Sequence, residues 1–221
     1  KRMKWPDDFF ILQQQLSYQS YLLDNYTLIE NFRNGQSNSI SYGATVSRNS
    51  IGDPIFPTGG SVVSLSVQAT PPFSMFNGLD YSTATPSEKF QWIEYHKWKI
   101  DSKWYQQLAK NLVVQTKVQF GFLGRYNTDL DVSPFERFYL GGDGLSGFGL
   151  DGREIIALRG YDNNSLSASF GSSIFTKYNM ELRYRISANP AATIFVLGFV
   201  EAGNGWNSFR EFTPFDVKKS G

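Results

Sequence analysis

Alternation between apolar and polar residues is the dominant pattern along this chain of 221 residues. In residues 173–187 the even positions are mostly apolar, such as Tyr178 and Leu182, whereas Lys177 and other charged residues occupy odd positions. A period of two predicts a β-strand with one apolar and one polar face. The same pattern covers residues 39–49 and 111–124, and less regular strand patterns cover 9–22, 60–71, 90–101 and 193–201. No segment has a convincing helical period, so the chain is predicted to be all-β, with about seven strands.

The lengths of the connections between these strands indicate which all-β architecture they build. In order, the connections are residues 23–38, 50–59, 72–89, 102–110, 125–172 and 188–192, so long ones alternate with shorter ones. Membrane β-barrels have long loops at one end and tight turns at the other. A soluble, lectin-like sandwich is the alternative, but it has no reason to place every long connection at one end. The pattern therefore predicts a transmembrane antiparallel β-barrel.

Aromatic residues, which make up 16% of the chain, support the membrane interpretation. Trp5 and Trp104 fall at the short-turn end, and Trp92 and Trp206 fall at the long-loop end, as two aromatic girdles would. The longest apolar stretch, residues 191–200, is about half as long as a membrane-spanning helix but suits a tilted strand. The net charge of +1 gives no reason to expect nucleic acid as a partner. The absence of Cys excludes disulfide scaffolds and thiolate metal sites.

The number of strands bears on completeness. Bacterial membrane barrels usually have an even number of strands, and an open edge leaves backbone groups unpaired in lipid. We therefore expect the chain to be a partial barrel. Its first residues are charged but no apolar run follows them, so we also expect its N-terminus to lie inside a longer gene product.

Three segments resemble one family in the same order along the chain. They are Pro134-Phe135-Glu136-Arg137-Phe138-Tyr139-Leu140-Gly141-Gly142, Leu158-Arg159-Gly160-Tyr161 and Val200-Glu201-Ala202-Gly203-Asn204-Gly205-Trp206. A Leu/Val-Arg-Gly-aromatic motif in a glycine-rich loop between membrane-type strands resembles the BamA family of outer-membrane barrel assembly proteins. The resemblance implies a barrel of sixteen strands that follows periplasmic POTRA domains.

This resemblance also implies where the chain belongs in such a protein. Residues 1–221 would be part of a C-terminal outer-membrane β-barrel domain and contain its middle to late strands, with the POTRA domains and the first and last strands outside. The loop at 125–172 would fold inward. The protein would reside in the bacterial outer membrane, and its partners would be the lipid bilayer, unfolded outer-membrane protein clients and the accessory subunits of the BAM machinery.

The resemblance further assigns roles to residues of the long loop. In BamA-like proteins the arginine of the motif lies inside the barrel and pairs with acidic residues on the two strands after the loop. The matching residues here are Arg159 and its carboxylate partners Glu181 and Glu201. Gly160 would allow a tight turn, and Tyr161 would pack against the wall. The hinge positions of the loop, where a positive φ angle is cheap for glycine, would be Gly141, Gly142 and Gly144.

The predicted function is the folding and insertion of β-barrel proteins into the outer membrane. Two-partner secretion transporters and TamA-like factors share the barrel and the arginine loop, and they are the alternatives within the superfamily. A passive porin is the alternative from another class. It would explain polar lumen faces, but not an arginine motif that occurs with two acidic residues in family order.

No enzymatic site is predicted. His96 is the one histidine, and no G-x-S-x-G elbow accompanies it to form a hydrolase triad. Residues 142–147 fit G-x-G-x-x-G, but no βαβ pattern surrounds them, and Asp129 and Asp131 lack the glycine and terminal glutamate of an EF-hand. We expect no catalytic residue, metal or cofactor. Residues 145–157, which separate two of the family-like segments, are interpreted as an elaboration of the loop.

Overall fold

A computed structural model describes residues 2–3, 7–27, 32–144, 153–168, 170–189 and 192–215. Seven strands form one antiparallel sheet in the order β1-β2-β3-β4-β5-β8-β9. They are β1 (Phe10–Leu23), β2 (Gly35–Asn49), β3 (Gly59–Ala69), β4 (His96–Ala109), β5 (Leu112–Gly124), β8 (Ile174–Asn189) and β9 (Ala192–Trp206). The predicted all-β fold with seven strands is confirmed.

The remaining elements are short. Two strands inside the long loop, β6 (Phe138–Leu140) and β7 (Glu154–Ile156), form a separate parallel pair. Helical structure among the described residues is limited to the 3-10 turn η1 (Phe73–Met75) and the helix α1 (Pro86–Lys89). Neither these nor any other helix in the described ranges has the length and apolar character needed to cross a membrane.

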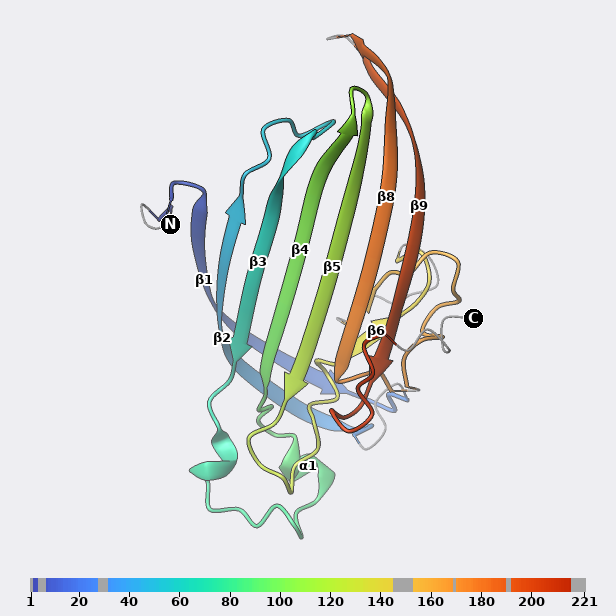
Figure 1. The fold of residues 1–221 in the computed structure, drawn as a ribbon. Coiled ribbons are helices and arrows are strands. Elements are labelled where there is room, and N and C mark those ends of the chain that lie inside the picture. Colours follow the sequence, from blue (N-terminus) through green and yellow to red (C-terminus); the bar gives the residue numbers. More distant parts are fainter. Residues whose placement is uncertain are drawn as a thin grey trace.

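The connections alternate in length, as the sequence predicts. Short connections, residues 50–58 and 110–111, join β2 to β3 and β4 to β5. Residues 24–34, 70–95 and 125–173 make the long connections at the opposite end. Figure 1 shows the sheet curling so that the ends of β1 and β2 pass behind β5 and β8, with the segment that contains β6 on the concave side.

The two faces of the sheet differ in polarity because side chains alternate along every strand. On the convex face, apolar side chains such as Met180, Leu182 and Val200 are exposed. The concave face carries polar side chains beneath the long loop, among them the buried Lys97 and Gln115. Apolar residues outside and polar residues inside are typical of a membrane barrel.

The fourth strand differs from the sequence prediction. The pattern predicts a strand at 90–101, but β4 runs from His96 to Ala109. Residues 90–95 instead belong to a buried part of the preceding loop, where the Ile93 amide donates to the carbonyl oxygen of Asn38 at 2.8 Å. Residues 102–107 resemble a turn, yet they form a strand, and Tyr105 packs against Phe56 and Val113 on the concave side.

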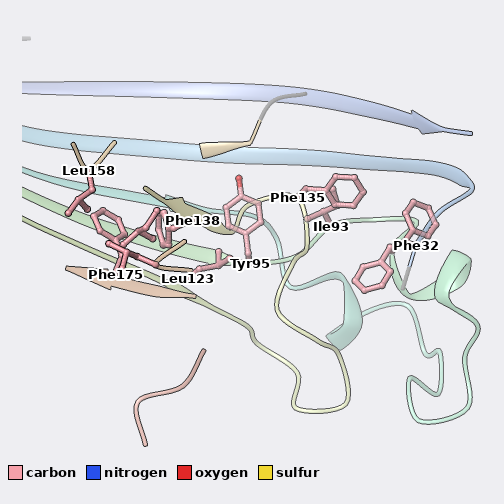
Figure 2. Close-up of a cluster of buried hydrophobic side chains, with 11 residues drawn as sticks. Phe32, Ile93, Tyr95, Leu123, Phe135, Phe138, Leu158 and Phe175 are labelled. Carbon is pink, nitrogen blue, oxygen red and sulfur yellow. The ribbon is translucent and has the colours of Figure 1, made fainter. Parts of the chain in front are cut away.

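The main apolar cluster lies between the long loop and the concave face. Its buried members are Phe32, Phe90, Ile93, Tyr95, Leu123, Phe135, Phe138, Leu140, Leu158, Leu166 and Phe175. Figure 2 shows these side chains with the blue ribbons of β1 and β2 above and the ribbons of later strands below. The Phe135 ring stacks on Tyr21 of β1 at 4.5 Å, and the Phe138 ring meets Phe175 of β8 at 4.7 Å. The long loop therefore connects distant strands across the curve of the sheet.

Tryptophans lie at both ends of the sheet. Trp206 ends β9 at the long-loop end, Trp92 lies in the long connection before β4, and Trp104 is in the half of β4 nearer the short turns. These positions agree with the predicted girdles. Trp5 and residues 145–152, which include most of the proposed loop elaboration and the last glycine of G-x-G-x-x-G, lie outside the described residues.

Candidate functional site

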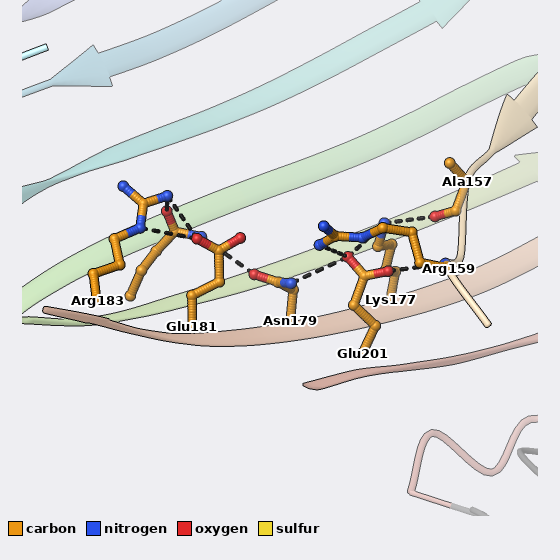
Figure 3. A network of polar contacts seen from close by, with 8 residues as sticks. Ala157, Arg159, Lys177, Asn179, Glu181, Arg183 and Glu201 are labelled. Carbon is orange, nitrogen blue, oxygen red and sulfur yellow. Dashed lines mark hydrogen bonds and ion pairs between the residues drawn. The ribbon is translucent and has the colours of Figure 1, made fainter. Parts of the chain in front are cut away.

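The arginine motif follows β7 and reaches the concave face of β9. Arg159 donates to Glu201 twice, from Nη2 to Oε1 at 2.8 Å and from its backbone amide to Oε2 at 3.0 Å. The guanidinium also lies 3.6 Å from the ring centroid of Phe199. A carboxylate that binds both the side chain and the backbone of one residue restrains its position as well as its charge. Arg159 and Glu201 therefore join the end of the loop to β9 (Figure 3).

Glu201 is the buried member of this ion pair, with its side chain 5% exposed against 46% for Arg159. Its Oε1 also accepts from Nδ2 of Asn179 at 3.1 Å, and Nζ of Lys177 lies 3.5 Å away. Lys177 donates in addition to the carbonyl oxygen of Ala157 at 2.5 Å. Two cations and an amide thus compensate the buried carboxylate. We call Arg159, Lys177, Asn179 and Glu201 the arginine anchor.

Leu158 and the two glycines before the motif hold the motif against the wall. Leu158 is fully buried, and its Cδ1 atom would lie 2.9 Å from a Cβ on Gly203 of β9. The Leu158 amide donates to the carbonyl oxygen of Gly142, and the Gly142 amide donates to that of Tyr161, both at 2.9 Å. Tyr161 packs against the main apolar cluster. The Gly-Gly segment and the arginine motif therefore form one structural unit.

The predicted hinge glycines are needed for two different reasons. Gly142 has a φ of 75°, and a Cβ there would overlap the side-chain amide of Asn163. Gly141, with a φ of 121°, has similarly little space. Gly160 has a φ of 88° but open space around the missing side chain, so only its backbone conformation requires glycine. Gly144, with a φ of 74°, also has the left-handed conformation.

Glu181 occupies a different place from the one expected for it. Its Oε2 accepts from Nε and Nη2 of Arg183 at 2.9 and 2.6 Å, so its ion pair lies within β8. Arg183 also donates to Gln115 at 2.8 Å, and Gln115 donates to Asn179 at 3.2 Å. Contrary to the expectation, Glu181 makes no ion pair with Arg159 among the described residues. These hydrogen bonds, which Figure 3 shows, link it to the arginine anchor.

A second contact between loop and wall, which the sequence analysis missed, centres on Lys97 of β4. Its Nζ lies 2.7 Å from Oε2 of Glu154 and 3.0 Å from Oε2 of Glu136, and the lysine side chain is 4% exposed. Nζ also lies 4.8 Å from the ring centroid of Phe138. Lys99 binds the other oxygen of Glu154 at 3.0 Å. We call Lys97, Lys99, Glu136 and Glu154 the lysine clasp.

The sequence carried only a weak signal for the lysine clasp. Lys97 and Lys99 alternate on one face of a predicted strand, and Glu136 lies in a family-like segment. Charges with this spacing most often face solvent. Which carboxylates meet them depends on the path of the long loop, which the pattern does not specify.

Two loop residues illustrate the electrostatics of these contacts. The hydrogen bond from Arg159 to Glu201 raises the pKa of the guanidinium. For Glu154, burial raises the pKa, but the charges of Lys97 and Lys99 outweigh burial and place the pKa of the carboxyl below its ordinary value. The Arg159 guanidinium and the Glu154 carboxyl are therefore both charged at neutral pH.

These contacts restrain a loop, and their chemistry is that of ion pairs and hydrogen bonds. His96 packs on Phe122 and Tyr126, with ring centroids 5.6 and 5.3 Å away, and its Nδ1 accepts from Nε1 of Trp98 at 3.1 Å. In the part of the chain that the structure describes, no group of three His, Asp or Glu residues could hold a metal ion.

Comparisons with known proteins place this geometry in context. A family model described as the Omp85 superfamily domain matches residues 10–220. Among solved structures, the chain is similar to BamA from Haemophilus ducreyi lacking POTRA domains 1–3, with a TM-score of 0.56 and 18% sequence identity. That match covers 78% of this chain and 31% of the other, so this chain spans less than a third of its length. The search of curated proteins found no match. At this identity the structural similarity establishes a shared fold.

Proposed function

This chain belongs to the Omp85 superfamily, and from that premise we propose that it forms part of the barrel of an outer-membrane protein assembly factor. The protein would fold client β-barrels and insert them into the bacterial outer membrane. The seven-stranded sheet would be a section of its C-terminal barrel domain. The exposed apolar side chains of the convex face would contact the lipid bilayer.

The observation that carries this proposal is the contact between Arg159 and Glu201. It fixes the end of the long loop to β9 through both a side chain and a backbone amide. Together with the apolar cluster, it ties the loop to β1, β5, β8 and β9. Such a loop stiffens the wall from inside.

A stiff wall suits the proposed activity. The resemblance to the BamA family implies that client strands pair with an open edge of the barrel, as in other cases of strand addition. One part of the barrel must then open while the rest keeps its shape. We propose that the strands described above belong to the part that keeps its shape, and that the arginine anchor maintains it. Unfolded outer-membrane proteins and accessory subunits would be the protein partners.

A second candidate is a related secretion transporter, either of the two-partner type or TamA-like. The family match is compatible with a secretion transporter, because the matching model describes a domain of the whole superfamily. A passive porin is a third possibility. In a passive porin the loop would set the size of the pore, and the assembly of other proteins would not depend on it.

The test is complementation of a depletion strain with the full-length protein that carries Arg159→Ala. We expect lower levels of folded porins in the outer membrane, because the loop loses its charged contact with β9. Arg210→Ala is the matched control, since it removes an exposed arginine from the segment after β9. Loss of a single secreted protein with normal porins would identify a transporter. Normal porin levels and normal secretion with Arg159→Ala would reject the assembly function.

A further inference from the structure

The lysine clasp and the arginine anchor lie at opposite ends of the same two loop strands. Glu136 precedes β6, and Glu154 is the first residue of β7. The strands pair in parallel, with Phe138 opposite Glu154 and Leu140 opposite Ile156. Because they run in the same direction, both strands begin beside Lys97.

Both strands also end at the arginine motif. The chain leaves β6 into Gly141 and Gly142, and the Gly141 amide donates to the carbonyl oxygen of Ile156 at 3.1 Å. Gly142 then pairs with Leu158, so the two chains stay together up to Arg159. An extended chain from Glu154 to Arg159 spans about 16 Å at about 3.3 Å per residue. The β6–β7 pair is therefore a short, hydrogen-bonded spacer between two contacts with the wall.

Packing prevents this spacer from sliding along the wall. Phe138 exchanges two backbone hydrogen bonds with Ser172, at 2.9 and 2.7 Å, just before β8 begins. Its ring lies between Nζ of Lys97 and the ring of Phe175. A Cβ on Gly121 of β5 would come within 2.9 Å of that ring, so the fit depends on a glycine.

The charges at the start of the spacer depend on Lys97. Glu136 and Glu154 have side chains that are 13% and 27% exposed, and Lys97 contacts both. The other lysine of the clasp, Lys99, is 42% exposed and binds Glu154. Two partly buried carboxylates without a shared cation repel each other. The starts of β6 and β7 would then separate from the wall.

We infer that Lys97 is a positioning residue for the arginine motif. By holding Glu136 and Glu154 it fixes where the spacer begins, and the spacer then delivers Arg159 to Glu201. Lys97 itself contacts neither Arg159 nor Glu201. The inference rests on the proposed function, in which the seating of the motif supports the assembly of client proteins.

The test is amide hydrogen exchange of the full-length protein in detergent, comparing Lys97→Met with Lys103→Met. Both substitutions remove a lysine charge from the concave face of β4, but Lys103 makes no ion pair with any described residue. We expect exchange in residues 153–161 to accelerate at least about tenfold in Lys97→Met, because a buried ion pair is broken. Lys103→Met should exchange as the unsubstituted protein does, and Lys97→Arg should restore most of the protection.

The result separates this inference from the proposed function. Exchange at the unsubstituted rate in Lys97→Met overturns the inference, whatever happens to client assembly. Fast exchange with normal porin assembly supports the positioning role and counts against the assembly function. If Lys97→Met does not fold, Glu154→Gln takes its place, because it releases β7 while Lys97 stays paired with Glu136. The same acceleration is expected, and its absence has the same meaning.

Discussion

The long loop is held by two contacts of opposite polarity. At the arginine anchor the loop supplies the cation, Arg159, and the wall supplies the carboxylate of Glu201. At the lysine clasp the wall supplies the cation, Lys97, and the loop supplies Glu136 and Glu154. In both contacts the most buried charge belongs to the wall, with Glu201 5% and Lys97 4% exposed. Each buried wall charge therefore gains an oppositely charged partner from the loop, and Glu201 has Lys177 of the wall as a second cation.

The arginine anchor and the lysine clasp differ in the groups that form them and so in the substitutions that would break them. Glu201 binds the backbone amide of Arg159 as well as its side chain, and Lys177 and Asn179 also contact it. The ion pairs of the lysine clasp join side chains alone. The arginine anchor should thus tolerate the loss of its arginine side chain better than the loss of its carboxylate.

The largest expected effect is that of Glu201→Ala. It removes the carboxylate that Arg159, Lys177 and Asn179 contact, and it leaves Lys177 and Arg159 near each other without a counter-charge. Breaking a buried ion pair costs about 3–5 kcal/mol, and we expect a loss of stability in this range. Arg159→Ala should cost less, since its side chain is half-exposed and Glu201 keeps its other contacts. The temperature at which the full-length protein loses its heat-modifiable mobility measures both, and equal losses would contradict the difference.

Substitution of glycines in the long loop should have the next largest effect. Gly142→Ala requires both a left-handed residue and room that the side chain of Asn163 occupies, so that side chain or the Gly-Gly segment must shift. Gly160→Ala has open space and should cost only the backbone penalty of about 1–2 kcal/mol. Protease cleavage within residues 153–168 would report loosening of the loop. Similar cleavage in the two variants would show that close packing at Gly142 is unimportant.

Acid should weaken the lysine clasp. The pKa of Glu154 lies below its ordinary value in the folded protein, because Lys97 and Lys99 outweigh the effect of burial. Its ionisation therefore adds stability at any pH above the ordinary pKa, and this stability is lost as pH falls through the lower folded pKa. The melting temperature of Glu154→Gln should be lower than that of the unsubstituted protein at pH 7. The gap should narrow as the pH falls below the ordinary glutamate pKa of about 4.3, and a gap that stayed constant into strong acid would contradict the electrostatic origin.

Glu181→Gln should have the smallest effect on the loop. Glu181 binds Arg183 within β8, so the substitution weakens that pair but leaves the contact between Arg159 and Glu201 intact. Hydrogen exchange of residues 153–161 should stay within about twofold of the unsubstituted protein. A large acceleration would mean that Glu181 holds the arginine motif directly.

The sequence predicted the fold well because barrel strands alternate in polarity, and β5 and β8 do so with little exception. It failed at β4, where a buried loop segment resembles a strand and a polar strand resembles a turn. It also placed Glu181 beside Arg159. The register explains this difference, because Asn179 lies opposite Glu201, whereas Glu181 lies opposite Phe199. Strand register and the path of a long loop depend on contacts between distant residues, and a local pattern does not contain them.

We propose that the charge contact between Arg159 and Glu201 holds the loop and that client assembly depends on it. A charge exchange in the full-length protein tests this most directly, with Arg159→Glu and Glu201→Arg made singly and together and folded porins measured in the outer membrane. We predict that each single substitution lowers porin levels and that the combination restores part of them, since the charges are again opposite. A combination no better than the worse single substitution, or single substitutions without effect, would contradict the account.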